Sequence, residues 1–243
     1  MRTELSIILQ IILESLPVSS SGNLALFGLT LPTDINYAAH SATLVIYALF
    51  FRKKIMVVLL QPLRFYKTIV HAVLYGVLAL LPTLFFYCFI EYTQPEFTLW
   101  SGFVITSLAL FLSALPAGAD TGISGYKAFL IGASQGVALL PGISRLGITC
   151  AMARWLGFSW RTAFAFSCMI EAPLLLVATS KGFYDLFSAG GCLALWQVLI
   201  YGAATLVSYG IFLFVYRMAK NNYWWIFGIY TSVLACLAFK IVS

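Results

Sequence analysis

The sequence predicts an all-α polytopic membrane protein, and three observations lead to that class. Of the 243 residues, 62% are hydrophobic and only 9% are charged, whereas soluble domains carry roughly 25% charged residues. Long apolar runs recur along the chain, and most charged residues lie between them. The net charge of +6 is typical of the basic bias of membrane loops. These features exclude a soluble enzyme, a disordered segment and a nucleic-acid binder.

Six apolar runs are candidates for transmembrane helices. A helix needs about 20 residues to cross about 30 Å of hydrocarbon. Five of the runs reach or approach this length. The first run is shorter and would span the bilayer only together with flanking residues. The runs cover approximately residues 36–51, 68–90, 97–116, 162–180, 193–216 and 222–239.

Two further segments, residues 5–31 and 126–158, each contain two short apolar arms around a break of proline, serine and glycine. The longer arms rise only about 18–22 Å, which ends inside the bilayer. Broken backbone at that depth is tolerated only where protein buries it or where it lines a watery cavity. We therefore expect both segments to be re-entrant helical hairpins.

The two hairpins are similar in sequence. Gln10, followed by a Leu-Pro pair and a glycine, matches Gln135 in the second hairpin, about 125 residues later. This offset predicts one membrane domain with two repeats, approximately 1–118 and 119–243, each a hairpin followed by three spans. An odd number of crossings per repeat would invert the second copy relative to the first.

The charges of the loops independently predict how the chain is oriented in the membrane. Residues 52–67 contain five Lys or Arg and no acid, which predicts a cytoplasmic loop. The next loop carries Glu91 and Glu96 and should face outward. The first hairpin would then enter from outside and the second from the cytoplasm, as the inverted repeat requires.

Two ionisable side chains, Glu14 and Arg145, lie at the breaks of the hairpins. An ionisable residue inside the membrane is costly unless it is paired or solvated. Gln10 precedes Glu14 by four residues, so both project from one helix face. Oxygen ligands of this kind suit a divalent cation, Mg²⁺ or Ca²⁺, and the carboxylate is alternatively a general base.

Hydroxyl groups accompany both charges, at the starts of the second arms, where free backbone N–H groups attract anions. The hydroxyl residues at or just after the breaks are Ser19, Ser20, Ser21, Ser144 and Thr149. With an arginine to bind the anion, they predict a phosphate site in which a serine attacks. The alternative is a Glu14–Arg145 ion pair that only locks the hairpins together.

The residues around the two breaks resemble the sequence motifs of a known family. The stretches Glu14–Gly22 and Pro141–Thr149 are similar to the two signature motifs of bacterial undecaprenyl-diphosphate phosphatases of the bacitracin-resistance type. The resemblance implies an enzyme of the bacterial plasma membrane that hydrolyses undecaprenyl diphosphate to undecaprenyl phosphate and phosphate, recycling the lipid carrier for cell-wall synthesis. It also implies six spans plus two re-entrant hairpins, a divalent cation and an active site open to the periplasm. The partners would be the polyprenyl diphosphate and membrane lipids, and a homodimer is left open.

The resemblance also assigns roles. Gln10 and Glu14 match the acid or amide pair associated with metal and catalysis, and Ser20 matches the hydroxyl usually proposed as nucleophile. Arg145 matches the phosphate-binding arginine, and Thr149 matches the hydroxyl residue after it. We expect Glu14 to act as base or metal ligand, with an activated water as the alternative nucleophile. Further phosphate-binding residues are expected to be Ser19, Ser21, Asn23 and Ser144.

The sequence departs from the family at three positions. Asn23 replaces the usual histidine, and asparagine cannot exchange a proton near pH 7 as imidazole can. Leu146 replaces a serine beside the phosphate. Glu171 stands where the family is generally apolar. We interpret Glu171 as lying near a span end or pairing with Arg161 or Arg154, rather than as a replacement acid.

A second class of function remains open. Inverted repeats with broken helices recur in transporters, so the chain is alternatively a transporter or flippase for polyprenyl phosphate. The missing histidine also leaves open a catalytically impaired relative of the phosphatase. His40 begins a span, and we expect it to pack or to hydrogen-bond rather than to catalyse.

Overall fold

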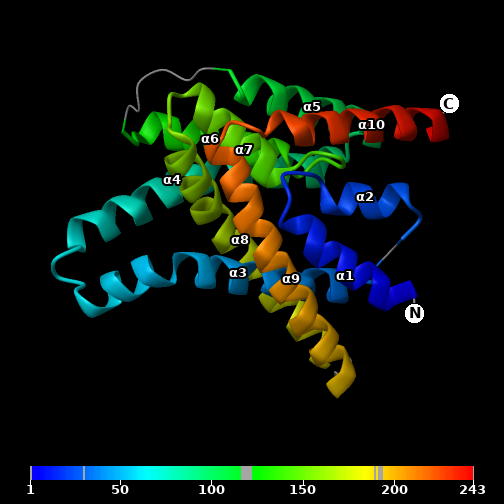
Figure 1. The fold of residues 1–243 in the computed structure, drawn as a ribbon, viewed down its shortest axis with the longest axis horizontal. Helices are drawn as coiled ribbons and strands as arrows, with labels where there is room; N and C mark the ends of the chain where they lie inside the picture. Colours follow the sequence, from blue (N-terminus) through cyan, green and yellow to red (C-terminus); the bar gives the residue numbers. More distant parts are fainter. Residues whose placement is uncertain (1, 30, 116–121, 189, 191–193, 243) are drawn as a thin grey trace.

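The computed structural model describes residues 2–29, 31–115, 122–188, 190 and 194–242, and ten helices and no strand occur in them (Figure 1). The helices are α1 Arg2–Glu14, α2 Ser20–Leu26, α3 Thr33–Leu60, α4 Tyr66–Thr93, α5 Leu99–Ser113, α6 Gly125–Val137, α7 Arg145–Trp155, α8 Trp160–Ser188, α9 Leu195–Lys220 and α10 Trp225–Val242. The predicted repeat boundary at residues 118 and 119 lies outside the described part of the chain.

Several helices suit a bilayer. Within the described residues, α4, α8 and α9 are long and apolar enough to cross a membrane, and α5 and α10 are shorter apolar helices. Leu74, Val77 and Leu81 lie along α4, and each is about half exposed. Soluble proteins rarely expose a continuous apolar face of this kind. The chain is therefore a helical membrane protein.

The prediction of a loop from residue 52 was wrong, because α3 continues to Leu60. Arg52, Lys53 and Lys54 thus lie on a helix. No glycine or proline interrupts residues 52–60, and Pro62 then disfavours helical backbone at Gln61, where α3 has its C-cap. The connection to α4 is only residues 61–65.

Two pairs of short helices flank breaks in the segments that the sequence singled out. α1 and α2 flank residues 15–19, and α6 and α7 flank residues 138–144. These four helices have 13, 7, 13 and 11 residues, too few to cross about 30 Å of hydrocarbon. Ser19 and Ser144 cap the second helix of each pair, because each hydroxyl accepts a backbone N–H three residues later.

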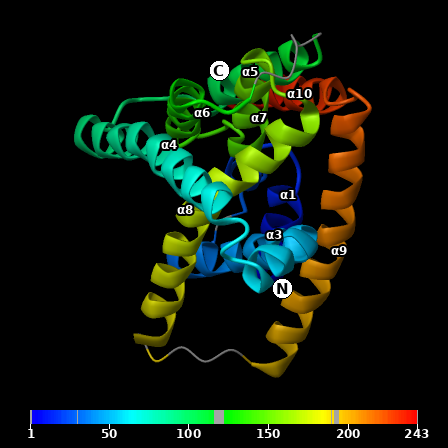
Figure 2. The ribbon, with the colours of Figure 1, turned by 90° about the vertical axis from the view of Figure 1, so that its left-hand side faces the viewer.

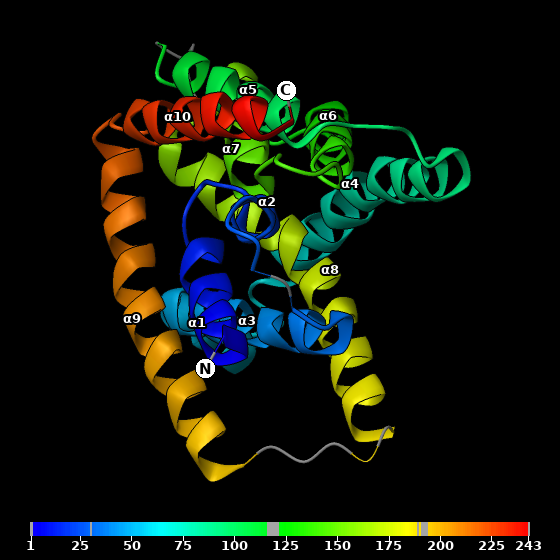
Figure 3. The same ribbon diagram turned by 90° about the vertical axis from the view of Figure 1, so that its right-hand side faces the viewer.

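Four helix pairs make much of the packing: α3 with α8, α5 with α10, α4 with α6, and α1 with α9. Figures 2 and 3 show α1 between α8 and α9, with α5 and α10 side by side at one end of the molecule. Ile46, Phe164, Phe212 and Trp224 belong to the largest cluster of buried apolar side chains. This cluster fixes α3 against α8 and α9 next to the two breaks.

Candidate active site

One face of α3 carries three polar side chains towards the middle of the molecule. His40, Thr43 and Tyr47 are spaced three and four residues apart, so they project from the same side of the helix. All three are buried. Each contacts a carboxylate from another helix, and this arrangement makes α3 the support of the site.

Glu14, the last residue of α1, is held by two of these side chains. His40 Nδ1 hydrogen-bonds Glu14 Oε1, and Thr43 Oγ1 donates to Glu14 Oε2 at 2.7 Å. Both carboxylate oxygens therefore have partners, and the carboxylate is fixed in orientation. The hydrogen-bonding role expected for His40 is confirmed, whereas its partner was not foreseen.

Glu171 lies in the same region, which corrects its sequence interpretation. Its Oε2 accepts a hydrogen bond of 2.6 Å from the Tyr47 hydroxyl, and its Oε1 lies 3.5 Å from NH1 of Arg145. Glu171 thus pairs with neither Arg161 nor Arg154, and it lies well inside α8. The reason is tertiary: α7 packs on α8 and brings Arg145 to Glu171.

The predicted alternative, an ion pair between Arg145 and Glu14, is also not among the ion pairs of the described residues. Among the described residues, the ion pairs at the site are Arg145 with Glu171 and Glu14 with His40. Arg145 is the first residue of α7, directly after the capping Ser144. Its Nε is buried without a hydrogen-bond partner. The guanidinium therefore retains unused donor capacity.

A cavity of about 60 Å³ is lined by residues of both breaks. Both carboxylates, the arginine and four serines line it, together with apolar side chains. The polar lining residues are Glu14, Ser19, Ser20, Ser21, Ser144, Arg145 and Glu171. Residues more than 100 positions apart in the sequence thus meet around one small polar space.

Close backbone contact holds the two breaks together. A Cβ on Gly22 would lie 3.0 Å from the Cα of Gly142, and a Cβ on Gly147 would lie 3.0 Å from the carbonyl oxygen of Pro17. Gly142 also has a φ of 82°, which favours glycine. Glycine at these positions lets the backbones of the two segments approach closely.

α5 anchors the second break through one side chain. Thr106 Oγ1 donates to the carbonyl oxygen of Gly142 at 3.1 Å and accepts the backbone N–H of Ser144 at 3.0 Å. Thr106 is fully buried. This pair of hydrogen bonds sets the position from which Arg145 extends.

Two predicted phosphate ligands do not line the cavity. The Asn23 amide donates to the carbonyl oxygen of Ser19 at 2.7 Å, and its oxygen accepts from the Tyr230 hydroxyl at 2.6 Å. The Thr149 hydroxyl donates to the carbonyl oxygen of Arg145 at 2.8 Å. Both side chains thus support the backbone around the breaks, and the geometry gives no support for direct phosphate contact by either.

Gln10 does not line the cavity either, but it has a feature that fits a cation site. Its side chain is buried, and its Oε1 has no hydrogen-bond partner. It lies one turn before Glu14 on α1. The described residues contain no group of three His, Cys, Asp or Glu that could hold a metal ion. An amide and a carboxylate oxygen suit Mg²⁺, which commonly takes one or two carboxylates with substrate phosphates and water.

The sequence interpretation missed Thr43 and Tyr47. The available signal was a row of polar residues at helical spacing, His40, Thr43 and Tyr47, within an otherwise apolar run. Such a row indicates a face turned away from lipid. It does not by itself identify the partners of that face.

An arginine beside two carboxylates and several serines thus lines one polar cavity between the broken helices of a membrane protein. Comparison with known proteins gives a family as well. The model of the family "Bacitracin resistance protein BacA" matches residues 5–237, so the chain belongs to that family.

Curated relatives cover most of the chain. It is 30% identical to an undecaprenyl-diphosphatase of Borreliella burgdorferi, with 96% of each chain aligned. It is 31% identical to an undecaprenyl-diphosphatase of Christiangramia forsetii, over 87% of this chain and 93% of the relative. It is 29% identical to the enzyme of the same name from Desulfosudis oleivorans, over 93% of both.

Proposed function

We propose that this protein is an undecaprenyl-diphosphatase, an integral membrane hydrolase that converts undecaprenyl diphosphate to undecaprenyl phosphate and phosphate. The observation that carries this function is the meeting of Glu14, Ser20 and Arg145 around one polar cavity. The family and the names of its relatives agree with it. The product is the lipid carrier that cell-wall synthesis uses again.

Each residue of the cavity has a separate role in the proposed reaction. Arg145 and the N-terminus of α7 hold the terminal phosphate, because guanidinium groups and helix N-termini both bind phosphate oxygens. The Ser20 hydroxyl attacks this phosphorus while Glu14 takes its proton, and the bond from phosphorus to the oxygen of the lipid phosphate breaks. Water then hydrolyses the phosphoserine. In the alternative route, Glu14 activates a water that attacks directly.

His40 and Thr43 are positioning residues in this scheme. They hold both oxygens of Glu14 and so orient the carboxylate towards the cavity. Ser19, Ser21 and Ser144 line the same cavity and add hydroxyl and backbone groups near the phosphate.

A divalent cation, Mg²⁺ or Ca²⁺, would be held by Gln10 and Glu14 together with substrate oxygens. It would supply neutralisation of the charge that develops on the phosphate. The unpartnered Oε1 of Gln10 supports this assignment.

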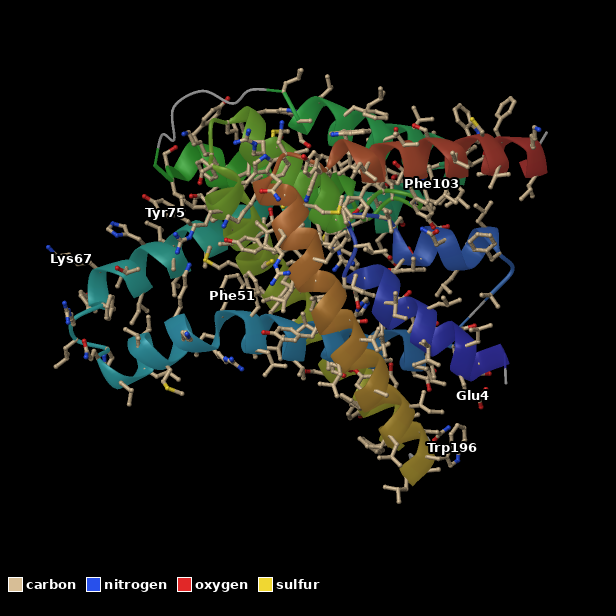
Figure 4. All side chains as sticks on the ribbon, in the orientation of Figure 1. Glu4, Phe51, Lys67, Tyr75, Phe103 and Trp196 are labelled. Carbon is tan, nitrogen blue, oxygen red and sulfur yellow. The ribbon has the colours of Figure 1, made fainter. Side chains whose placement is uncertain are left out.

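The polyprenyl tail is assigned to a groove of about 1080 Å³ between α3, α4 and α8. Its walls are mainly apolar and include Phe51 on α3 and Tyr75 on α4, both labelled in Figure 4. Tyr47 lines the groove, and its hydroxyl contacts Glu171 in the cavity. A tail in this groove would therefore begin next to the anion site.

We further infer six spans and two re-entrant hairpins in an inverted repeat, in the bacterial plasma membrane with the cavity open to the outer side. Exchanging the halves of the chain converts the α4–α6 contact into the α9–α1 contact, and it leaves the pairs α3–α8 and α5–α10 unchanged. This pairing supports a two-fold relation between the repeats. The basic residues 52–54 near the end of α3 would remain on the cytoplasmic side.

The direct test is phosphate release from undecaprenyl diphosphate by purified protein with Mg²⁺ or Ca²⁺. Wild type should hydrolyse the lipid, whereas Glu14→Gln and Arg145→Ala should fall to background. Wild-type activity no higher than that of these variants would refute the proposal.

The transporter alternative is tested separately. Leaflet exchange of the lipid in proteoliposomes without phosphate release would identify a transporter. A large gain of hydrolysis in Asn23→His would instead identify an impaired phosphatase.

A further inference from the structure

The cavity contains a carboxylate that the proposed hydrolysis does not use. Glu171 is 6% exposed and lines the same space as Ser20 and Arg145. A negative charge at this place opposes the binding of an anion. We therefore ask what a carboxylate does beside the arginine that is proposed to bind phosphate.

The two contacts of Glu171 are unequal. The hydrogen bond from Tyr47 is 2.6 Å long, whereas the closest approach of Arg145 is 3.5 Å. A charge-assisted hydrogen bond from a guanidinium is normally about 2.7–2.9 Å. The carboxylate is thus anchored to α3, and the arginine is held mainly by charge.

Arg145 is arranged to take another anion. Its side chain is 26% exposed, compared with 7% for Glu171, so Arg145 is the more accessible member of the pair. Its Nε is buried without a hydrogen-bond partner. An arriving phosphate can therefore use a donor that Glu171 leaves unsatisfied.

We propose that Glu171 is a built-in competitor for Arg145 that lowers the affinity of the site for phosphate groups. This inference rests on the proposed phosphatase function. In the free protein Glu171 neutralises Arg145. The terminal phosphate of a diphosphate, which carries more charge than one carboxylate and lies beside a second phosphate, displaces it.

The same competition favours release of the products. When inorganic phosphate or the lipid monophosphate leaves, Glu171 pairs with Arg145 again, and this pairing offsets part of the cost of removing the product from the guanidinium. Tyr47 is a positioning residue here, because it keeps the carboxylate on α3 instead of letting it close fully on the arginine. Glu171 would thus weaken the binding of products at Arg145 and speed their release.

Inorganic phosphate is the probe for the test. Its dissociation constant is measured with purified protein in detergent, from the rise of the thermal unfolding midpoint with phosphate concentration. Glu171→Gln keeps the shape of the side chain and removes its charge. It should lower the dissociation constant about tenfold or more, since an opposite charge at this range shifts ionic equilibria by roughly 10- to 1000-fold.

Two variants serve as controls. Glu171→Asp keeps the charge and should restore a dissociation constant near that of wild type. Glu91→Gln makes the same chemical change at an exposed carboxylate at the end of α4 and should leave phosphate binding unchanged. In steady-state assays Glu171→Gln should lower kcat and KM together, because product leaves slowly.

Tyr47→Phe gives a prediction of opposite sign. Without its anchor, the carboxylate can approach Arg145 closely and compete better, so phosphate should bind several-fold more weakly. If Glu171→Gln does not fold, the phosphate affinity of Tyr47→Phe still tests whether Glu171 competes for Arg145.

Unchanged or weaker phosphate binding in Glu171→Gln would overturn the proposal, and so would tighter binding in Tyr47→Phe. Loss of kcat in Glu171→Gln with unaltered phosphate affinity would also overturn it, and would place Glu171 in the chemical step. If wild type hydrolyses no lipid, the proposed function fails. The order of phosphate affinities among the variants still tests the role of Glu171.

Discussion

Substitution of Thr43 tests whether α3 positions the Glu14 carboxylate for the proposed reaction. The Thr43 hydroxyl donates to Glu14 Oε2 at 2.7 Å, and its side chain is 1% exposed. Thr43→Val replaces the hydroxyl with a methyl group of similar size, so it removes the donor and leaves little empty space. Glu14 keeps its contact with His40 but loses the constraint on its second oxygen.

The magnitude follows from the kind of hydrogen bond. A hydrogen bond to a charged group contributes about 1.5–3 kcal/mol in soluble proteins, and side-chain hydrogen bonds within membrane proteins contribute about 0.6–1.7 kcal/mol. A loss of about 1–2 kcal/mol of transition-state stabilisation corresponds to a decrease of roughly 5- to 30-fold in kcat/KM.

The assay is phosphate release from undecaprenyl diphosphate, with thermal unfolding measured on the same preparations. Thr231→Val is the matched control, because Thr231 is also fully buried and its hydroxyl donates only to carbonyl oxygens of its own helix. It should alter kcat/KM less than about twofold, since its hydroxyl lies outside the site.

The reasoning would be refuted if Thr43→Val retained full kcat/KM while Glu14→Gln was inactive. Glu14 would then be essential without needing its hydrogen bond from α3. Equal losses in Thr43→Val and Thr231→Val would point to a general loss of packing instead.

Asn23→Ala should lower the thermal unfolding midpoint and leave phosphate affinity nearly unchanged, because the Asn23 side chain does not line the cavity and instead bonds Tyr230 and the carbonyl of Ser19. A selective loss of phosphate binding would contradict this. Thr106→Val should cost about 1–3 kcal/mol of stability, measured by denaturation, because the backbone N–H of Ser144 loses its buried partner. An unchanged denaturation midpoint would count against this anchoring role. Chelation of divalent cations should abolish hydrolysis, and Gln10→Ala should raise the Mg²⁺ concentration for half-maximal activity roughly tenfold. An unaltered Mg²⁺ dependence would exclude Gln10 as a ligand.

Local features of the sequence predicted the helix breaks well. Ser19 and Ser144 are the N-caps of α2 and α7, so both segments are broken where proline and serine cluster. Proline, glycine and capping serines act on neighbouring backbone, so their effect can be predicted without the rest of the fold. The same local rules failed for α3, where basic residues were taken for a loop although nothing there ends a helix.

Partners across the fold could not be predicted in the same way. Tyr47 and Glu171 are 124 positions apart and are joined by a hydrogen bond. Helical spacing identifies which side chains share a face, but it does not say which helix covers that face. The pairs Glu171 with Arg145 and Glu14 with His40 depend on how α1, α3, α7 and α8 pack.

The sequence by itself determined that this protein lies in a membrane, and it selected residues for the proposed site. Scarcity of charge placed it in a membrane, and the charges remaining at the breaks, Glu14 and Arg145, pointed to the site. Only the tertiary structure decided which groups neutralise those charges. Inside a membrane protein every charge needs a partner, and that partner is set by helix packing rather than by nearness along the chain. For this reason Glu171 became a member of the site, and Asn23 became part of its support.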